Sequence, residues 1–412
     1  MHVFAQKSYR YLTAVSLCGL AVFIPFSIAG ANVSIMLGFL ASIIGIIAVP
    51  SVRQRYAEIK NDPMTLACLL LVVSAIPSVL MSETLPRALR DWKSYWLLLV
   101  YFLVAYNLTS SGLRRAVFWI LFVATSVSCL VAVVQYRGGL DLLFIHISRQ
   151  SLRPSSTLFT MTFAGILYQL ITVNFTVLLR RRRISWIEPF FVGGLLLQIV
   201  GLVLTLTRGA WVALFGGLTS VVFLIRRKLV FIIAGALFIS VVAIALQDVR
   251  VRKKVASIPW NDKQESDVNI STRFVLWDVS WDVIKSHPIL GVGMGDFTTE
   301  AEKRLAGRHV ETLIDSHNIY LQILATRGLV GFLPFLYFWF VLLRSLHRAR
   351  RRLREHQGFG WHFVTGVLAA AVAVLIGALT ENNIDDSEIF TAFMLLVGMA
   401  GSFARTPDRD TT

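Results

Sequence analysis

Charged residues are scarce in this chain of 412 residues, because Asp, Glu, Lys and Arg together make up only 16% of it. Soluble domains carry about a quarter of such residues, so the composition argues against an ordinary cytosolic enzyme. Hydrophobic residues make up 56% of the chain, and its 28 Phe, 10 Trp and 10 Tyr could not stay solvated in a disordered protein. The sequence therefore indicates an integral membrane protein with apolar runs of membrane-spanning length.

Cysteine is also rare, and its placement excludes two kinds of site. The chain has 3 cysteines, Cys18, Cys68 and Cys129, and each lies inside an apolar run. Their number is odd and their spacing shows no pairs. Neither a disulfide framework nor a thiolate metal site is indicated.

Apolar segments follow one another along most of the chain. A helix needs about 20 mostly apolar residues to cross about 30 Å of bilayer hydrocarbon. The first segment follows Lys7 and Arg10, as a secretion signal would, but it is longer than a signal core and another apolar run follows at once. We expect one all-α polytopic domain over residues 1–412, with about 12 transmembrane helices. The segments lie near 12–30, 34–50, 63–81, 94–108, 116–136, 156–179, 189–206, 210–225, 229–247, 328–343, 361–379 and 389–404, and none contains Asp, Glu, Lys or Arg.

Basic residues are unevenly distributed between alternate loops, which predicts the topology. Short loops rich in Lys and Arg stay on the cytoplasmic side. With a cytoplasmic N-terminus, the inside loops hold most of these residues, including the run Arg180–Arg183 and a cluster from Arg344 to Arg354. This bias predicts that both termini are cytoplasmic, and it explains most of the net charge of +16 through contacts with membrane lipids, without nucleic acid. The short outside loops hold only Arg87, Arg90, Lys93, Arg137, Arg149, Arg153 and Arg208.

One external loop, residues 248–316 between the ninth and tenth segments, is much longer than the others. Long ordered loops are usually functional. Ser271 or Thr272 can cap a helix that continues from Arg273 to Ser286. We expect this amphipathic helix to lie at the membrane interface or to cover the bundle. Its apolar face consists of Phe274, Trp277, Trp281 and Ile284.

Because the spans are uncharged, the external charges are the candidates for chemistry. Arg208 lies in a tight turn between two apolar segments and is held at the membrane surface. It either fixes the turn by snorkelling or binds a lipid-linked phosphate through paired hydrogen bonds. Arg273 opens the amphipathic helix and could provide a second phosphate contact, although such a residue is often only solvated.

His317 lies where the long loop enters a helix that ends near Leu343. A lone external histidine is often structural, but here Asp315 or Ser316 can cap the helix and fix the imidazole near its positive end. We expect this field and neighbouring arginines to lower the pKa of His317 and keep it neutral. A neutral imidazole can take a proton from a sugar hydroxyl near neutral pH.

Four further residues are weaker candidates for substrate binding. Arg149 and Arg153 lie in the outside loop before the sixth span and could contact lipid phosphates. Asn318 follows His317 directly, and Asn382 lies with Glu381 at the external end of the eleventh span. Side chains there could touch an acceptor sugar, although a solvated loop is the simpler interpretation. Arg327 is a candidate only because it lies near these residues in the sequence.

Several short stretches, taken in their order along the chain, resemble the sequences of a known family. These stretches are Thr205–Trp211, Arg273 with Trp277, His287–Gly293, Asp315–Leu321 and Arg327 with Gly328. Together they resemble the O-antigen ligase family, whose superfamily also includes O-antigen polymerases and O-linked oligosaccharyltransferases. The similarity covers roughly residues 190–345, and the layout of twelve spans extends it to the whole chain.

The resemblance implies a C-type glycosyltransferase-like fold in the bacterial inner membrane. It implies transfer of O-antigen glycan from undecaprenyl diphosphate to a sugar of the lipid A-core oligosaccharide at the periplasmic face. Carried over position by position, Arg208 and Arg273 would bind the diphosphate and His317 would activate the acceptor hydroxyl, with inversion at the anomeric carbon.

The resemblance also implies that catalysis needs no metal or other cofactor. The sequence agrees, since the first external loop, near residues 30–33, contains no acidic residue that could hold a divalent cation. No His-x-x-x-His pair or other ligand cluster occurs elsewhere in the chain.

Three other functions stay open. An O-antigen polymerase usually carries two sizeable external loops, whereas this chain has one. A protein O-oligosaccharyltransferase tends to be longer, with a soluble C-terminal region. A lipid or solute transporter usually shows ionisable groups at mid-membrane or a repeated half, and neither pattern is visible.

Overall fold

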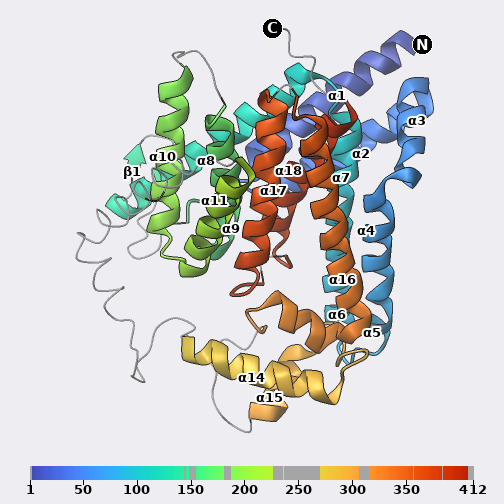
Figure 1. Ribbon diagram of the computed structural model, residues 1–412, viewed down its shortest axis with the longest axis vertical. Helices are drawn as coiled ribbons and strands as arrows, with labels where there is room; N and C mark the ends of the chain where they lie inside the picture. The colour runs from blue at the N-terminus through green and yellow to red at the C-terminus, as the bar shows by residue number, and fades with distance from the viewer. Residues whose placement is uncertain are drawn as a thin grey trace.

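The computed structural model describes residues 2–138, 140–142, 145–147, 155–180, 187–225, 235, 270–305, 315–355, 357–382 and 384–406. These residues are almost entirely helical (Figure 1). A short antiparallel hairpin pairs Leu140 with Ile147. The elements are α1 (His2–Phe23), α2 (Ile28–Ala48), α3 (Pro50–Ala57), η1 (Glu58–Asn61), α4 (Pro63–Ser74), α5 (Ile76–Leu80), α6 (Leu85–Lys93), η2 (Ser94–Leu98), α7 (Leu99–Asn107), α8 (Ser111–Arg137), β1 (Leu140–Leu142), β2 (Ile145–Ile147), α9 (Thr160–Leu178), α10 (Ile187–Leu204), α11 (Arg208–Ile225), α14 (Ile270–Ser286), α15 (Phe297–Leu305), α16 (Ile319–Arg352), α17 (Phe359–Gly377) and α18 (Ser387–Arg405).

Eight helices within the described residues are long and apolar enough to cross a membrane. They are α2, α4 continued by α5, α8, α9, α11, α16, α17 and α18, and α10 is a shorter apolar helix. The prediction of an all-α polytopic membrane protein is thereby confirmed. Eleven of the twelve predicted segments coincide with helices, while the ninth, residues 229–247, lies outside the described residues.

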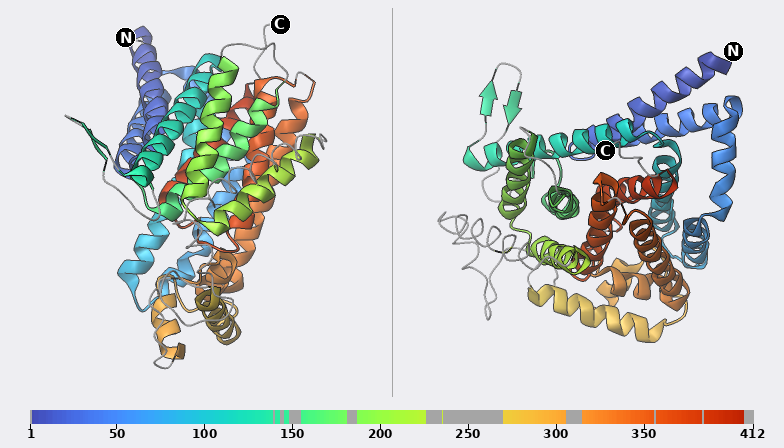
Figure 2. Two further views of the ribbon diagram at one scale, coloured as in Figure 1. Left: turned by 90° about the vertical axis from the view of Figure 1, so that its left-hand side faces the viewer. Right: turned by 45° about the horizontal axis from the view of Figure 1, so that its top comes forward.

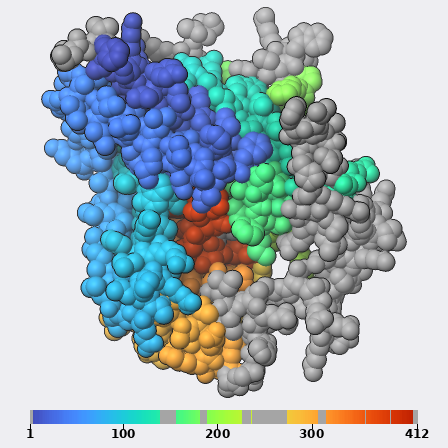
Figure 3. Space-filling model, turned by 180° about the vertical axis from the view of Figure 1, so that it is seen from behind, coloured from blue at the N-terminus to red at the C-terminus, as the bar shows by residue number. Residues whose placement is uncertain are grey.

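The helices alternate in direction, so the two chain ends lie at the same end of the molecule (Figure 1). The opposite end carries α6, α14 and α15, which run across the ends of the other helices (Figures 1 and 2). In the view from behind, part of the C-terminal segment (red) is visible at the surface, between the N-terminal helices (blue) and a green segment that follows them in the chain (Figure 3). That this end faces the cytoplasm stays a prediction.

The helices α9, α17 and α18 form the centre of the bundle and are the most buried of the candidate spans. Small residues allow this close packing. A methyl group at Gly366 of α17 would lie 2.9 Å from the Cα of Val173 in α9. Lipid chains are as apolar as the helix surfaces, so tight van der Waals contact of this kind stabilises helix pairs in a membrane.

The amphipathic helix of the long loop is present as α14, but it begins at Ile270. Ser271 and Thr272 are therefore inside the helix, and the prediction that either caps it was wrong. Val279 and Val283 pack against α15 and α16. Of the predicted apolar face, Phe274 and Trp281 are 57% and 52% exposed, whereas Trp277 and Ile284 are half-buried, so only part of this face points away from the protein.

Gly328 interrupts α16 with φ 58° and ψ −160°, and the stretch that follows α14 packs into this break. Val292 N donates to Ala325 O at 2.9 Å, and Leu329 N donates to Pro288 O at 2.9 Å. A methyl group at Gly328 would lie 2.3 Å from the carbonyl carbon of Ile289. Glycine is required there, because any side chain would collide with backbone. The break sets the first turns of α16 at an angle to the span and places His317 beside α17.

Candidate functional site

The start of α16 is joined to the end of α17 by hydrogen bonds. Ile319 N donates to Ala378 O at 3.0 Å, and Tyr320 Oη donates to Leu375 O at 2.8 Å. Asn318 caps α16, since its Oδ1 accepts from the backbone N of Tyr320 and Leu321 at 3.0 and 3.2 Å. The expected cap at Asp315 or Ser316 was wrong. Asn318, predicted as a substrate contact, uses its side-chain oxygen for this cap, and its contact with a substrate stays a prediction.

His317 adopts a left-handed backbone conformation with φ 48°, which is uncommon for a residue other than glycine. The Oδ1 atom of Asp315 accepts a hydrogen bond from His317 N at 2.7 Å and holds this turn. The ring atom Nδ1 lies 3.6 Å from both Asp315 Oδ1 and Glu381 Oε2. Nε2 is buried and has no hydrogen-bond partner in the described structure. One ring nitrogen therefore faces carboxylates, and the other is buried without a partner among the described residues.

Glu381, directly after α17, joins two of the three predicted catalytic residues. Its Oε1 accepts from Arg273 Nη2 at 2.5 Å, while its Oε2 faces the His317 ring. Glu381 is only 7% exposed. Arg273 Nε is buried without a partner among the described residues, so part of its guanidinium stays open. The structure thus brings Arg273 and His317 together around one carboxylate.

Arg208 is the first residue of α11, and the start of this helix packs against the segment that carries Glu381. The contact is made by its neighbour: a methyl group at Gly209 would lie 2.5 Å from Thr380 Oγ1 and 3.8 Å from Glu381 Cγ. The Arg208 side chain is exposed and forms no ion pair within the described part of the chain. A free guanidinium therefore stands at the helix N-terminus, where backbone N–H groups also favour an anion.

Comparison with protein families yields one match. Residues 193–336 match the family model described as O-Antigen ligase. This stretch of the chain is therefore similar to proteins of the O-antigen ligase/polymerase superfamily. No curated protein matches it. The matched stretch contains Arg208, Arg273 and His317 but ends before Glu381, so the residue that joins them lies outside it.

Sequence reasoning missed Glu381, which it interpreted as part of a solvated loop. The structure contradicts this interpretation, because the side chain is buried and paired with Arg273. One signal was available in the sequence: a single carboxylate directly follows an apolar span, on the same predicted side as two candidate arginines. A carboxylate buried at the end of a membrane span is costly in free energy unless a positively charged side chain pairs with it.

The predicted direction of the His317 pKa shift was also wrong. Interaction with the Glu381 side chain raises the pKa of His317 above its ordinary value of 6.5, and Asp315 adds to this effect. Burial and the charge of Arg273 oppose the increase. The two carboxylates outweigh the arginine and the burial, so His317 has a strengthened affinity for a proton.

Arg327 and Asn382 belong to a second group beside the first. Arg327 is buried, donates to the Tyr95 hydroxyl and lies 3.9 Å from Asp385 Oδ1. Asn382 Nδ2 donates to Asp385 Oδ2 at 3.0 Å, and Asn382 Oδ1 is buried without a partner in the described structure. Asn382, a predicted substrate contact, therefore keeps one polar atom available next to Glu381.

The remaining weak candidates, Arg149 and Arg153, lie outside the described residues. Within the residues that are described, no group of three or more His, Cys, Asp and Glu side chains could hold a metal ion.

Proposed function

We propose that this protein is an O-antigen ligase. It transfers a glycan from undecaprenyl diphosphate to a sugar hydroxyl of lipid A-core at the periplasmic membrane face. One observation carries the proposal: Nε2 of His317 has no partner among the described residues, while Nδ1 faces Glu381, which also pairs with the Arg273 guanidinium. Such a group of residues can take a proton from an alcohol and neutralise a leaving phosphate in one place.

His317 acts as the general base. In its neutral form Nδ1 carries the proton and faces Glu381, which leaves the Nε2 lone pair free to accept the proton of the acceptor hydroxyl. Glu381 holds the ring in this orientation and stabilises the imidazolium that forms. A base whose pKa lies near the operating pH transfers protons efficiently, and Glu381 raises the pKa of His317 from an ordinary value that is already close to neutral.

Arg208 and Arg273 bind the diphosphate of the donor. As the bond from the anomeric carbon to the phosphate oxygen breaks, negative charge grows on that oxygen, and fixed guanidinium groups stabilise it more in the transition state than in the ground state. The hydroxyl attacks from the opposite face of the sugar, so configuration inverts. We assign charge neutralisation to these arginines, and the reaction needs no metal.

The exposed aromatic face of α14 supports a reaction between two lipid-linked substrates. The helix α14 lies at the end of the bundle opposite the chain termini (Figure 1), and its Phe274 and Trp281 are exposed. Aromatic side chains of this kind favour the membrane–water interface. Donor and acceptor held in the same bilayer plane lose much of their freedom before they meet, which lowers the entropic barrier.

Reconstitution of the purified protein tests this function. Carrier-linked glycan and lipid A-core are supplied together, and the products are separated by mass. A ligase forms glycan attached to lipid A-core and releases undecaprenyl diphosphate. Longer carrier-linked glycan, formed without lipid A-core, would identify a polymerase instead, and glycan on a protein acceptor would identify an oligosaccharyltransferase. Flux of the donor across vesicles without transfer would identify a transporter.

A further inference from the structure

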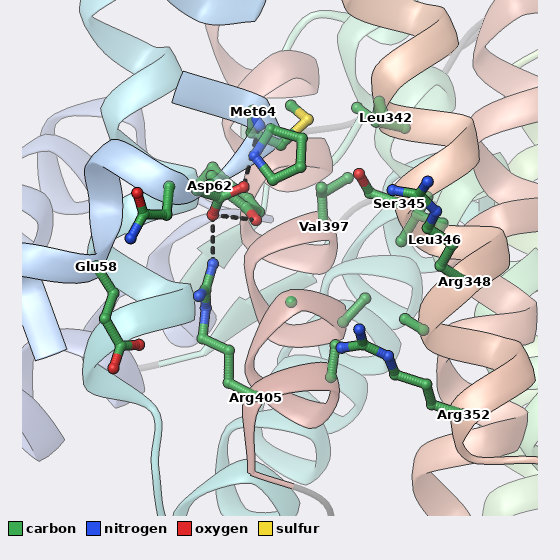
Figure 4. Close-up of a pocket in the computed structure, with 17 residues that line it drawn as sticks. Glu58, Asp62, Met64, Leu342, Ser345, Leu346, Arg348, Arg352, Val397 and Arg405 are labelled. Carbon is green, nitrogen blue, oxygen red and sulfur yellow. Dashed lines mark hydrogen bonds and ion pairs between the residues drawn. The ribbon is translucent and has the colours of Figure 1, made fainter. Parts of the chain in front are cut away.

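A second cavity lies at the opposite end of the molecule, near the two chain termini (Figures 1 and 4). It has a volume of about 630 Å³ and is enclosed by η1, the start of α4, α7, and the last turns of α16 and α18. Cavities that bind small amphiphiles have volumes of about 300–1,000 Å³. The cavity shares no residue with the site around His317.

One side of this cavity is a fixed ion pair. Asp62 is buried and accepts hydrogen bonds from Met64 N at 3.0 Å and from Tyr101 Oη at 3.0 Å. Arg405 pairs with the same carboxylate and lies over the ring of Tyr106, 3.9 Å from its centre. Because Asp62 and Arg405 neutralise each other, this side contributes little net charge.

The other side carries two arginines without counter-ions. Arg348 and Arg352 are four residues apart on α16, so they lie on one face of the helix. Both are exposed, and neither forms an ion pair or hydrogen bond with another described residue. Figure 4 shows the Arg352 guanidinium extending from α16 into the cavity. Glu58 is the one further acid in the lining, so the cavity has an excess of positive charge.

The wall between the two sides is apolar and consists of Leu342, Leu346, Val397 and Ala400. A small soluble anion would gain nothing from this wall. A molecule with a phosphate and a hydrocarbon chain would place the phosphate on the arginines through paired hydrogen bonds and the chain on the wall. We propose that this cavity binds one anionic phospholipid from the leaflet on the side of the termini.

Native mass spectrometry of the full-length protein in detergent tests the proposal. The probes are phosphatidylglycerol, phosphatidylcholine with the same acyl chains, and inorganic phosphate. We expect one phosphatidylglycerol to bind more tightly than phosphatidylcholine. Each basic side chain near an anionic lipid contributes about fivefold in affinity, so Arg348→Gln with Arg352→Gln should weaken phosphatidylglycerol binding about thirtyfold. Phosphatidylcholine binding should change little.

The control variant combines Arg344→Gln with Arg351→Gln, which removes the same charge from the same helix outside the cavity lining. It should keep the preference for phosphatidylglycerol. A second variant, Ala404→Trp, fills the cavity without changing its charge and should also weaken binding. An equal loss in the control variant would overturn the proposal, as would equal affinity for both lipids. Displacement of the lipid by millimolar inorganic phosphate would show that a free anion is the ligand and would overturn it too.

Discussion

Replacement of Glu381 by Gln tests the proposed catalytic arrangement most directly. The substitution keeps the shape of the side chain and removes its negative charge. The contact with Arg273, 2.5 Å long between side chains that are 20% and 9% exposed, becomes a hydrogen bond from the guanidinium to an uncharged amide oxygen. His317 loses the largest influence that raises its pKa, while Asp315, burial and Arg273 continue to act on it.

Two effects follow, and they have opposite consequences. A lower His317 pKa leaves more of the histidine neutral at acidic pH, so the acidic limb of the rate profile should move to lower pH. The imidazolium that forms during proton transfer loses its carboxylate partner. A charge-assisted hydrogen bond contributes about 1.5–3 kcal/mol, so the maximal rate should fall about tenfold to a hundredfold.

The assay measures kcat for glycan transfer to lipid A-core between about pH 5 and pH 9, the range in which histidine titrates. Glu388→Gln is the matched control, since Glu388 lies in the first turn of α18, after the same connection, and accepts a hydrogen bond from Ser387. If the maximal kcat falls but the acidic limb of the pH–rate profile stays at the same pH, Glu381 has only a structural role. An unchanged maximal rate would refute the assignment of Glu381.

Four further outcomes are expected. For the wild-type protein, the acidic limb should give an apparent pKa above 6.5, because His317 is a base only when deprotonated; a limb below 6.5 would contradict the raised pKa. Arg208→Ala and His317→Ala should each lower kcat by about a hundredfold or more with unchanged thermal unfolding, whereas Lys285→Ala, an exposed residue of α14, should not. Gly291→Ala, at φ 70° with its methyl group 2.3 Å from the Thr326 carbonyl carbon, should lower the unfolding midpoint. The cost should be about 2 kcal/mol or more, whereas Gly193→Ala meets no atom within 4 Å and should cost nothing. A chelator should leave transfer unchanged, and inhibition reversed by magnesium would show that a metal takes part.

The membrane class and the positions of the helices could be predicted from the sequence, because the length of an apolar run is a local property. A run of about 20 residues must become a helix in hydrocarbon to satisfy its own backbone. The superfamily was also accessible from the sequence, since short stretches such as Thr205–Trp211 and Asp315–Leu321 keep their order along the chain.

Only the tertiary structure decided what surrounds those residues. Glu381 is far from Arg273 and His317 in sequence, and the packing of α16 on α17 brings it to both. The direction of the His317 pKa shift depends on which charges lie within a few ångströms, so neighbours along the chain could not predict it. The break at Gly328 likewise depends on a loop about forty residues earlier that fills it. Hydrophobic burial in a membrane is set residue by residue along the chain, whereas electrostatic coupling depends on distances that only the folded chain fixes.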